Sequence, residues 1–577
     1  MKRRIEISQK RIKADFILKN AQVADVFNLR WRLADIVVAD GRIIAIDERG
    51  EFEAYEVEDA GGRYVIPGLI DAHIHIESSM LTPSEFNRIM LPHGITSVVT
   101  DPHEIANVSG TAGLQFMLDD AATAEMDIYF MLPSSVPGTS FEHAGAVLEA
   151  TDLAAFEGHA AVLGLAEVMD FPAVLNGEHN MLAKIEFAQK AGMVIDGHCA
   201  GLTSNQIRGY RAAGIQTDHE CVTADEARDR IEQGMYVFIR EGSAAKNLKS
   251  LLPAVTAANA RRFAFCTDDK HLDELMEQGS INYAVSLAIK EGMEPLQAIQ
   301  LASLNVAECY QLKDKGALAS GFIADFVMVE DLQTMKVSTV WKNGMKVTEN
   351  GQMLSAPTPK IDIMPAITAS VHLPKLTKDD LAILFTHGDR ANVIEIMPDQ
   401  LTTKRIECTV DVVEGQFVPS IEKDLLKLAV IERHHQLGTK GVAIVHGFGL
   451  QRGAVATTVA HDSHNAIVVG TNDADMLVAL EALQKMQGGL VVVADGQVLE
   501  EFALPIAGLM TDLQANVAAK SLLNVHEALQ QIHPDLHFHF FLTLSFLSLP
   551  VIPDIKLTDT GLFDVTQFQH ISVEIID

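Results

Sequence analysis

The chain of 577 residues has little positive charge and few cysteines, and both shortages restrict what it can bind and where it can work. It carries 45 basic against 77 acidic residues, a formal net charge of -32. Because nucleic acids and anionic membrane surfaces repel such a protein, neither is an expected partner. The five cysteines are scattered without a CxxC pair, which indicates a reducing compartment rather than a disulfide framework.

The sequence also lacks a recognisable secretion signal or membrane anchor. The N-terminal segment "MKRRIEISQKRIKADF" is basic but has no apolar stretch of the kind found in signal peptides. The most apolar run, residues 538–555, is short and broken by prolines, so we interpret it as buried core rather than as a membrane span. The sequence therefore predicts a cytoplasmic protein, and its length predicts two to four domains.

Strand-like and helix-like segments follow one another in an order that predicts an α/β fold with three domains. Residues 1–65 and 310–360 contain short apolar runs separated by turn residues, and we expect them to form one small β-sandwich domain. Between them, eight strand-like runs alternate with helical stretches, as in a TIM-like (β/α)8 barrel spanning residues 66–309. After a proline-rich joint, residues 361–577 are expected to form a C-terminal α/β domain.

Polar residues fall at the ends of several predicted barrel strands. Because the carboxyl ends of these strands meet at one face of a (β/α)8 barrel, their side chains are expected to converge there. His73 and His75 lie two apart on a strand, so they point to the same side and can bind one ion together. Nitrogen and carboxylate ligands without sulfur suit a divalent ion such as zinc, manganese or iron. The full set is His73, His75, Asp101, Glu167, His198, His219 and Asp268.

Each of these residues also has an ordinary structural explanation when it is taken alone. A His-x-His pair can mark a strand whose polar face meets water, and Glu167 can be a strand-end carboxylate in contact with solvent. His198 and His219 can be hydrogen-bonded interior histidines, and Asp268 can cap a helix. These explanations weaken when the four histidines, Glu167 and Asp268 are considered together, because they end five of the predicted strands.

Several longer motifs resemble those of the bacterial adenine deaminase family, which belongs to the amidohydrolase superfamily. They are "DAHIHIESSMLTP", "TDPHEIANVSG", "LGLAEVMDFP", "DGHCAG", "TDHE", "HDSHN" and "FLTLSFLSLPVIPDIKLTDTGLFDV". The resemblance runs from about residue 14 to the end of the chain. It implies a hydrolase that converts adenine and water to hypoxanthine and ammonia in purine salvage. Its partner would be a small purine base, and the protein would be a homo-oligomer, namely a dimer.

The resemblance also implies a binuclear centre of manganese or iron, with zinc as a third option. The metals would activate a water molecule, and Asp268 would take its proton and return it to the departing amino group. Glu167 occupies the position at which many members of the superfamily have a carbamylated lysine. His198 or His219 could polarise the substrate instead of binding metal. The implied ligands are His73, His75, Glu167, His198, His219 and Asp268.

A further group has to protonate N1 of the purine ring, and the sequence leaves its identity open. Adenosine deaminases use a glutamate three residues after the strand-five histidine, but Gly201 occupies that position here. The candidates are Glu77 in the strand-one loop and His103 or Glu104 in "DPHE". The alternative for His103 and Glu104 is a solvated loop that stabilises a turn of the barrel.

The segment "HDSHN" contributes Asp462 and His464, which with Asp101 are candidates for contact with the substrate or for a lid. The same segment could bind an additional ion or have a purely structural role. Three alternative functions also stay open. The substrate could be an N6-substituted adenine, or the enzyme could be a cyclic-amide hydrolase, although the lack of a strand-four lysine argues against that. A non-catalytic binding protein on this fold is the third, and the intact ligand positions argue against it.

Overall fold

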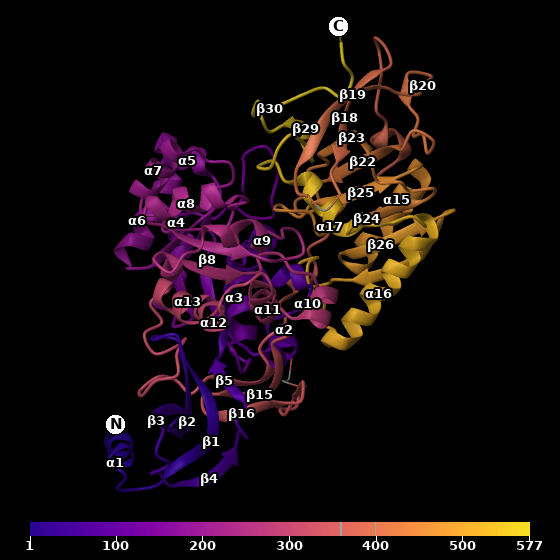
Figure 1. Ribbon diagram of the computed structural model, residues 1–577. Helices are drawn as coiled ribbons and strands as arrows, with labels where there is room; N and C mark the ends of the chain where they lie inside the picture. Colours follow the sequence, from indigo (N-terminus) through magenta and orange to yellow (C-terminus); the bar gives the residue numbers. More distant parts are fainter. Residues whose placement is uncertain (358–359, 399, 577) are drawn as a thin grey trace.

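The computed structural model describes residues 1–357, 360–398 and 400–576, which form three packed regions (Figure 1). A small β region lies below the barrel in this view, and a second α/β region lies beside the barrel. The predicted domain ranges include residues 358, 359, 399 and 577, which lie outside the described residues. The domain boundaries themselves stay predictions.

The small β region is a nine-stranded sheet built from two separate segments of the chain. Strand β5 pairs with β14 and so joins the segments. Apolar side chains from both segments, including Val23 and Trp341, pack into one core. A short helix, α1 (Lys2–Ser8), precedes the sheet and is not predicted by the sequence pattern. The strands are β1 (Ala14–Asp25), β2 (Arg30–Ala39), β3 (Arg42–Asp47), β4 (Ala54–Asp59), β5 (Tyr64–Pro67), β14 (Phe326–Asp331), β15 (Lys336–Lys342), β16 (Met345–Glu349) and β17 (Gln352–Met353).

The middle region contains eight parallel strands in two arcs, β6 to β10 and β11 to β13. Backbone hydrogen bonds join the arcs on both sides. The Gln216 N–H donates to the Ile195 carbonyl and the Asp268 N–H to the His73 carbonyl, each at 2.9 Å. This arrangement is that of the predicted (β/α)8 barrel. The strands are β6 (Leu69–Ile74), β7 (Ile95–Thr100), β8 (Asp127–Leu132), β9 (Val162–Val168), β10 (Val194–Gly197), β11 (Thr217–Asp218), β12 (Tyr236–Arg240) and β13 (Phe263–Cys266).

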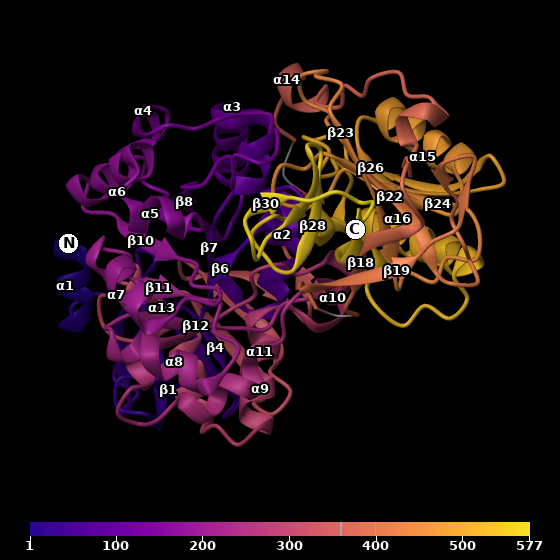
Figure 2. The same ribbon diagram turned by 90° about the horizontal axis from the view of Figure 1, so that it is seen from above.

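Helices cover the outside of the barrel strands, so both faces of each strand are shielded from water (Figure 2). This agrees with the burial of every residue of β6 and β7. The main helices are α2 (Pro83–Met90), α3 (His103–Ala121), α5 (Phe171–Asn176), α6 (His179–Lys190), α7 (Ser204–Ala212), α8 (Ala224–Glu232), α10 (Leu272–Gln278), α11 (Ile281–Lys290), α12 (Pro295–Leu301) and α13 (Leu304–Cys309).

The C-terminal region is built around an eight-stranded mixed sheet in which β18 and β23 pair in parallel. Helices α15 (Asp473–Met486) and α16 (Ala515–Ile532) pack against it, and α17 (Phe540–Ser545) lies between this sheet and the barrel (Figure 1). Among the described residues, no helix is both long and apolar enough to span a membrane. The strands are β18 (Arg390–Ile396), β19 (Thr403–Thr409), β22 (Leu425–Ile431), β23 (Lys440–His446), β24 (Ala454–Thr457), β25 (Ala466–Gly470), β26 (Gly489–Ala494) and β27 (Gln497–Ala503).

Candidate metal centre and active site

Two histidines and an aspartate meet at the carboxyl end of the barrel strands. His73 lies in β6, His75 follows that strand, and Asp268 follows β13. The two histidine Nε2 atoms are 3.2 Å apart, and Asp268 Oδ1 lies 3.5 Å from His73 Nε2 and 3.1 Å from His75 Nε2. All three side chains are buried. Ligands bound about 2 Å from one ion lie roughly 3 Å from each other, so this trio can hold a divalent ion.

Glu167, in β9, lies between two groups of histidines. Its Oε1 atom is 3.4 Å from His75 Nε2, and its Oε2 atom is 3.1 Å from His219 Nε2 and 2.7 Å from His198 Nδ1. Burial would raise the pKa of the Glu167 carboxyl, but the His219 charge and hydrogen bonds from the histidines lower it well below its usual range. A carboxylate whose two oxygens face different histidines can bridge two ions.

Asp101 and His103 extend this donor cluster at the end of β7. His103 Nδ1 lies 3.0 Å from Asp101 Oδ2 and 3.7 Å from Glu167 Oε1. The His75 Nδ1–H donates to the Asp101 carbonyl at 3.0 Å, which leaves the His75 Nε2 lone pair available for a metal. Asp101 Oδ1 is buried and has no hydrogen-bond partner in the described part of the chain. A bound cation would compensate such an oxygen, so the residues present fit a divalent metal centre.

A small cavity of about 40 Å³ opens beside the donor cluster and is walled by the barrel and by the C-terminal region. The aromatic ring of Phe546 stacks on the His461 ring, with centroids 4.3 Å apart and planes inclined by 10°. The apolar run that we interpret from sequence as buried core is indeed buried, and it also supplies part of this wall, a role that composition does not reveal. The residues contributed by the C-terminal region are Leu401, His461, Asp462, Phe546, Leu549 and Ile552.

The segment "HDSHN" lies against the mouth of the barrel. Asp462 lines the cavity, with its Oδ1 atom 3.6 Å from His103 Nε2, and His461 Nδ1 lies 3.6 Å from Glu104 Oε1. His464 is fully buried and is not among the described residues that line the cavity. Its Nδ1 atom accepts a hydrogen bond from the Ala460 N–H. Of the two sequence candidates here, Asp462 therefore reaches the cavity and His464 supports the segment from behind.

The two glutamates among the candidate proton donors lie at different distances from the cavity. Glu104, at the start of α3, lines the cavity, and its Oε1 atom accepts from the Ser78 hydroxyl. Its buried Oε2 atom has no hydrogen-bond partner among the described residues and lies 3.9 Å from His464 Nε2. Burial and the neighbouring Glu77 charge raise the pKa of Glu104 well above its usual value. Glu77 accepts from the Ile105 N–H at 3.3 Å, and burial raises its pKa to about 7. Glu77 is not among the described residues that line the cavity.

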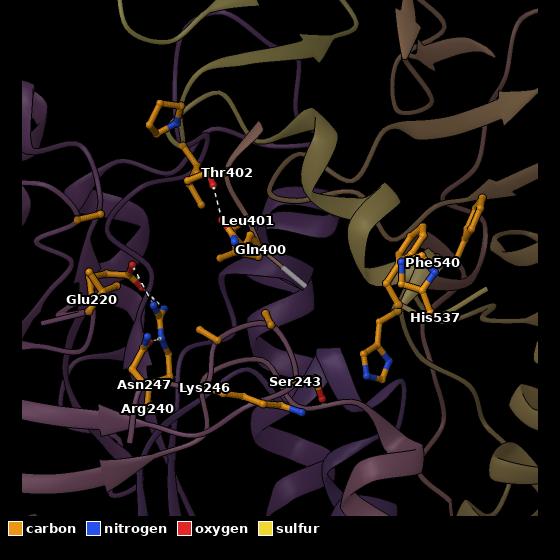
Figure 3. A pocket seen from close by; sticks show the side chains of 18 of the residues that line it. Glu220, Arg240, Ser243, Lys246, Asn247, Gln400, Leu401, Thr402, His537 and Phe540 are labelled. Carbon is orange, nitrogen blue, oxygen red and sulfur yellow. Dashed lines mark hydrogen bonds and ion pairs between the residues drawn. The ribbon is translucent and has the colours of Figure 1, made fainter. Parts of the chain in front are cut away.

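Sequence reasoning misses two charged residues beside Asp268. Arg240 ends β12 and donates from Nη1 to Asp268 Oδ2 at 2.7 Å. Glu220 accepts hydrogen bonds from the same guanidinium, and both residues also line a larger cleft of about 1060 Å³ that adjoins the cavity (Figure 3). Arg240 ends the strand-like run "YVFIR", so a search for basic as well as acidic and histidine residues at strand ends would find it.

Comparison with known proteins shows the family of the chain. Residues 64–347 match the amidohydrolase family and residues 400–569 match the adenine deaminase C-terminal domain. The adenine deaminase of Lysinibacillus sphaericus (strain C3-41) is 67% identical over 567 residues, which cover 98% of this chain and 97% of that protein. The chain belongs to the adenine deaminase family.

Further adenine deaminases show that the similarity extends over nearly the whole chain. The protein of Bacillus pumilus (strain SAFR-032) is 51% identical, and the match covers 99% of this chain and 98% of that protein. The protein of Bacillus subtilis (strain 168) is 49% identical, with 99% of each chain covered. The match to the amidohydrolase family implies a divalent metal centre, and the buried donor cluster provides the candidate ligands.

Proposed function

We propose that this member of the adenine deaminase family hydrolyses adenine to hypoxanthine and ammonia, as the names of its relatives indicate, and serves purine salvage. The observation that carries the proposal is the buried cluster of histidines and carboxylates at the barrel mouth, next to a small cavity. The C-terminal region contributes walls to that cavity, and the same region matches the adenine deaminase C-terminal domain.

We assign the cluster to two divalent ions, manganese or iron. Bound metal would supply Lewis acidity, which lowers the pKa of water to about 7. Glu167 has one oxygen toward each group of histidines, which supports a bridging role. The assigned ligands are His73, His75, Glu167, His198, His219 and Asp268, and Asp101 and His103 lie next to them.

Asp268 is assigned the transfer of a proton from the attacking water to the departing amino group. Burial alone would raise the pKa of its carboxyl, but the Arg240 charge and the hydrogen bonds from His73 and His75 hold it well below its usual range. The carboxylate is therefore ionised near neutral pH and able to accept a proton. After accepting the proton it becomes an acid beside the leaving ammonia.

Glu104 is assigned the protonation of N1, in preference to Glu77 and His103. Glu104 lines the cavity, and its Oε2 atom has no hydrogen-bond partner among the described residues. Burial and the neighbouring Glu77 charge raise its pKa well above the usual value, which favours the protonated carboxyl. Glu77 is not among the described residues that line the cavity. The His103 side chain pairs with Asp101 and lies near Glu167. Geometry therefore favours Glu104 as the group that reaches the ring.

A substrate comparison tests the proposed function. Protein loaded with manganese is incubated separately with adenine, N6-substituted adenines, adenosine and cyclic ureides, and ammonia, amine and ring-opened products are measured. We expect adenine to give the highest kcat/KM. A higher kcat/KM for an N6-substituted adenine would transfer the assignment to that substrate, and turnover of ureides alone would make the protein a cyclic-amide hydrolase.

Binding of adenine without any product would indicate a binding protein on this fold. The chain has Glu167 rather than a lysine in β9, which supports the deaminase over the cyclic-amide hydrolase. A cytoplasmic location and a homodimer stay predictions, which fractionation and light scattering would test.

A further inference from the structure

We infer that Arg240 is a positioning residue for the proposed deamination and that the segment 240–243 holds Asp268 in its working orientation. Asp268 has two carboxylate oxygens that face different partners. Oδ1 faces the Nε2 atoms of His73 and His75, whereas Oδ2 accepts from Arg240 Nη1 at 2.7 Å. The guanidinium therefore fixes the carboxylate rotamer and leaves Oδ1 directed at the metal-ligand histidines.

The guanidinium is itself held on its other side. Arg240 is 3% exposed, and its Nη1 and Nη2 atoms donate to the two carboxylate oxygens of Glu220. Its Nε–H also points toward Asn247 Oδ1, at 3.4 Å. Figure 3 shows Glu220 and Asn247 next to the Arg240 side chain, with dashed lines at the guanidinium. A planar guanidinium with hydrogen-bond partners on several sides has little freedom to rotate. A lysine ammonium could not make the same set of hydrogen bonds.

The backbone of Asp268 requires restraint because it adopts a left-handed conformation, with φ of 60°. A residue other than glycine adopts this conformation less readily, so contacts on both sides of Asp268 help to maintain it. The Asp268 N–H donates to the His73 carbonyl at 2.9 Å, and the His75 N–H donates to the Asp268 carbonyl at 3.3 Å. Strand β6 therefore fixes the backbone on one side, and Arg240 fixes the side chain on the other.

The residues after Arg240 fix the loop that carries Asp268. The Glu241 N–H donates to the Cys266 carbonyl at 3.0 Å, and the Ser243 N–H donates to the Asp269 carbonyl at 2.8 Å. Between them, a Cβ atom at Gly242 would lie 2.2 Å from the Thr267 carbonyl oxygen. The two loops thus approach so closely that only glycine fits at 242. The segment 240–243 contacts the catalytic loop through both backbone and side chain.

Two variants of Arg240 test this inference through adenine turnover and through the metal centre. In Arg240→Lys we expect kcat to fall roughly 10-fold to 100-fold, because a misplaced catalytic group costs up to about 100-fold. In Arg240→Met we expect a larger fall. KM should stay within about threefold of wild type, since the lost contact serves the reaction rather than adenine binding.

A second readout does not depend on turnover. We load each protein with Co²⁺ and record its visible absorption, which reports the geometry of the ligands. A rotated Asp268 should change the spectrum of both variants while about two ions remain bound per chain. The control is Arg262→Met, because Arg262 stacks over Tyr236 at 4.7 Å, at the opposite end of the barrel strands. It should match wild type in kcat and spectrum.

The inference is overturned if Arg240→Lys keeps kcat and the Co²⁺ spectrum of wild type. It is also overturned if Arg240→Lys loses metal or raises KM alone, since Arg240 would then act in metal retention or adenine binding. If Arg240→Met does not fold, Arg240→Lys decides. Absence of adenine turnover by wild type would contradict the proposed function instead, and the cobalt spectra would still show whether Arg240 orients Asp268.

Discussion

The identity of the proton donor to N1 gives a direct comparison of two glutamates. We expect Glu104→Gln to lower kcat for adenine by about 100-fold to 10,000-fold, the usual loss when a general acid is removed. By transition-state arithmetic this is about 3 to 5 kcal/mol. The fold should survive, because the glutamine carbonyl can still accept from the Ser78 hydroxyl and its amide would occupy the place of the unpartnered Oε2 atom.

The matched variant Glu77→Gln should lower kcat by less than about 10-fold, because Glu77 does not line the cavity and the glutamine carbonyl oxygen can still accept from the Ile105 N–H. The assay is steady-state ammonia release by manganese-loaded protein, with metal content measured for each variant. A large loss in Glu77→Gln together with near wild-type turnover in Glu104→Gln would refute the assignment. Equal losses in both variants would show that the pair acts as a unit, contrary to our reasoning.

Three further predictions concern the proton carrier, the metal and a buried lysine. Asp268→Asn should lower kcat at least about 100-fold because the amide cannot accept the water proton, and ICP mass spectrometry should show that metal is retained. Chelation should lower the melting temperature, because a metal ion whose free concentration is 1,000 times its Kd stabilises the folded state by about 4 kcal/mol. An unchanged melting temperature would argue against a resident metal. Burial lowers the pKa of Lys556 to about 7 in the folded protein, whereas it is about 10.4 in the unfolded chain. Between about pH 7 and about pH 10.4 the unfolded chain therefore binds more protons than the folded protein, and the free energy of unfolding should rise with pH over this range. Denaturant unfolding at pH 7 and 9.5 should show a smaller rise in Lys556→Met than in wild type.

The barrel and the order of its polar residues could be predicted from sequence because both follow local patterns. Apolar runs separated by helical stretches give the strands, and a residue such as His219 or Asp268 at the end of a run falls at one face of the barrel. The separation between Glu77 and Glu104 could not be predicted, since both follow strands and only packing decides which lines the cavity.

The remaining features of the site that could not be predicted from sequence depend on contacts between distant segments. Phe546 lies in a run whose composition resembles ordinary core, and its place at the cavity depends on the docking of the C-terminal region on the barrel. No local pattern encodes such docking. The pairing of Arg240 with both Glu220 and Asp268 similarly depends on the close approach of neighbouring strand ends.

The barrel and the C-terminal region together form the walls of the cavity beside the donor cluster, and this has a consequence for biosynthesis. The donor cluster is complete once the ribosome has passed Asp268, but Phe546 and Ile552 are added only near the end of translation. A nascent chain could therefore bind metal in an open barrel before it can enclose a purine. Full activity should appear only after the last segment has docked, so ribosome-bound chains stalled before residue 540 should take up manganese without releasing ammonia from adenine.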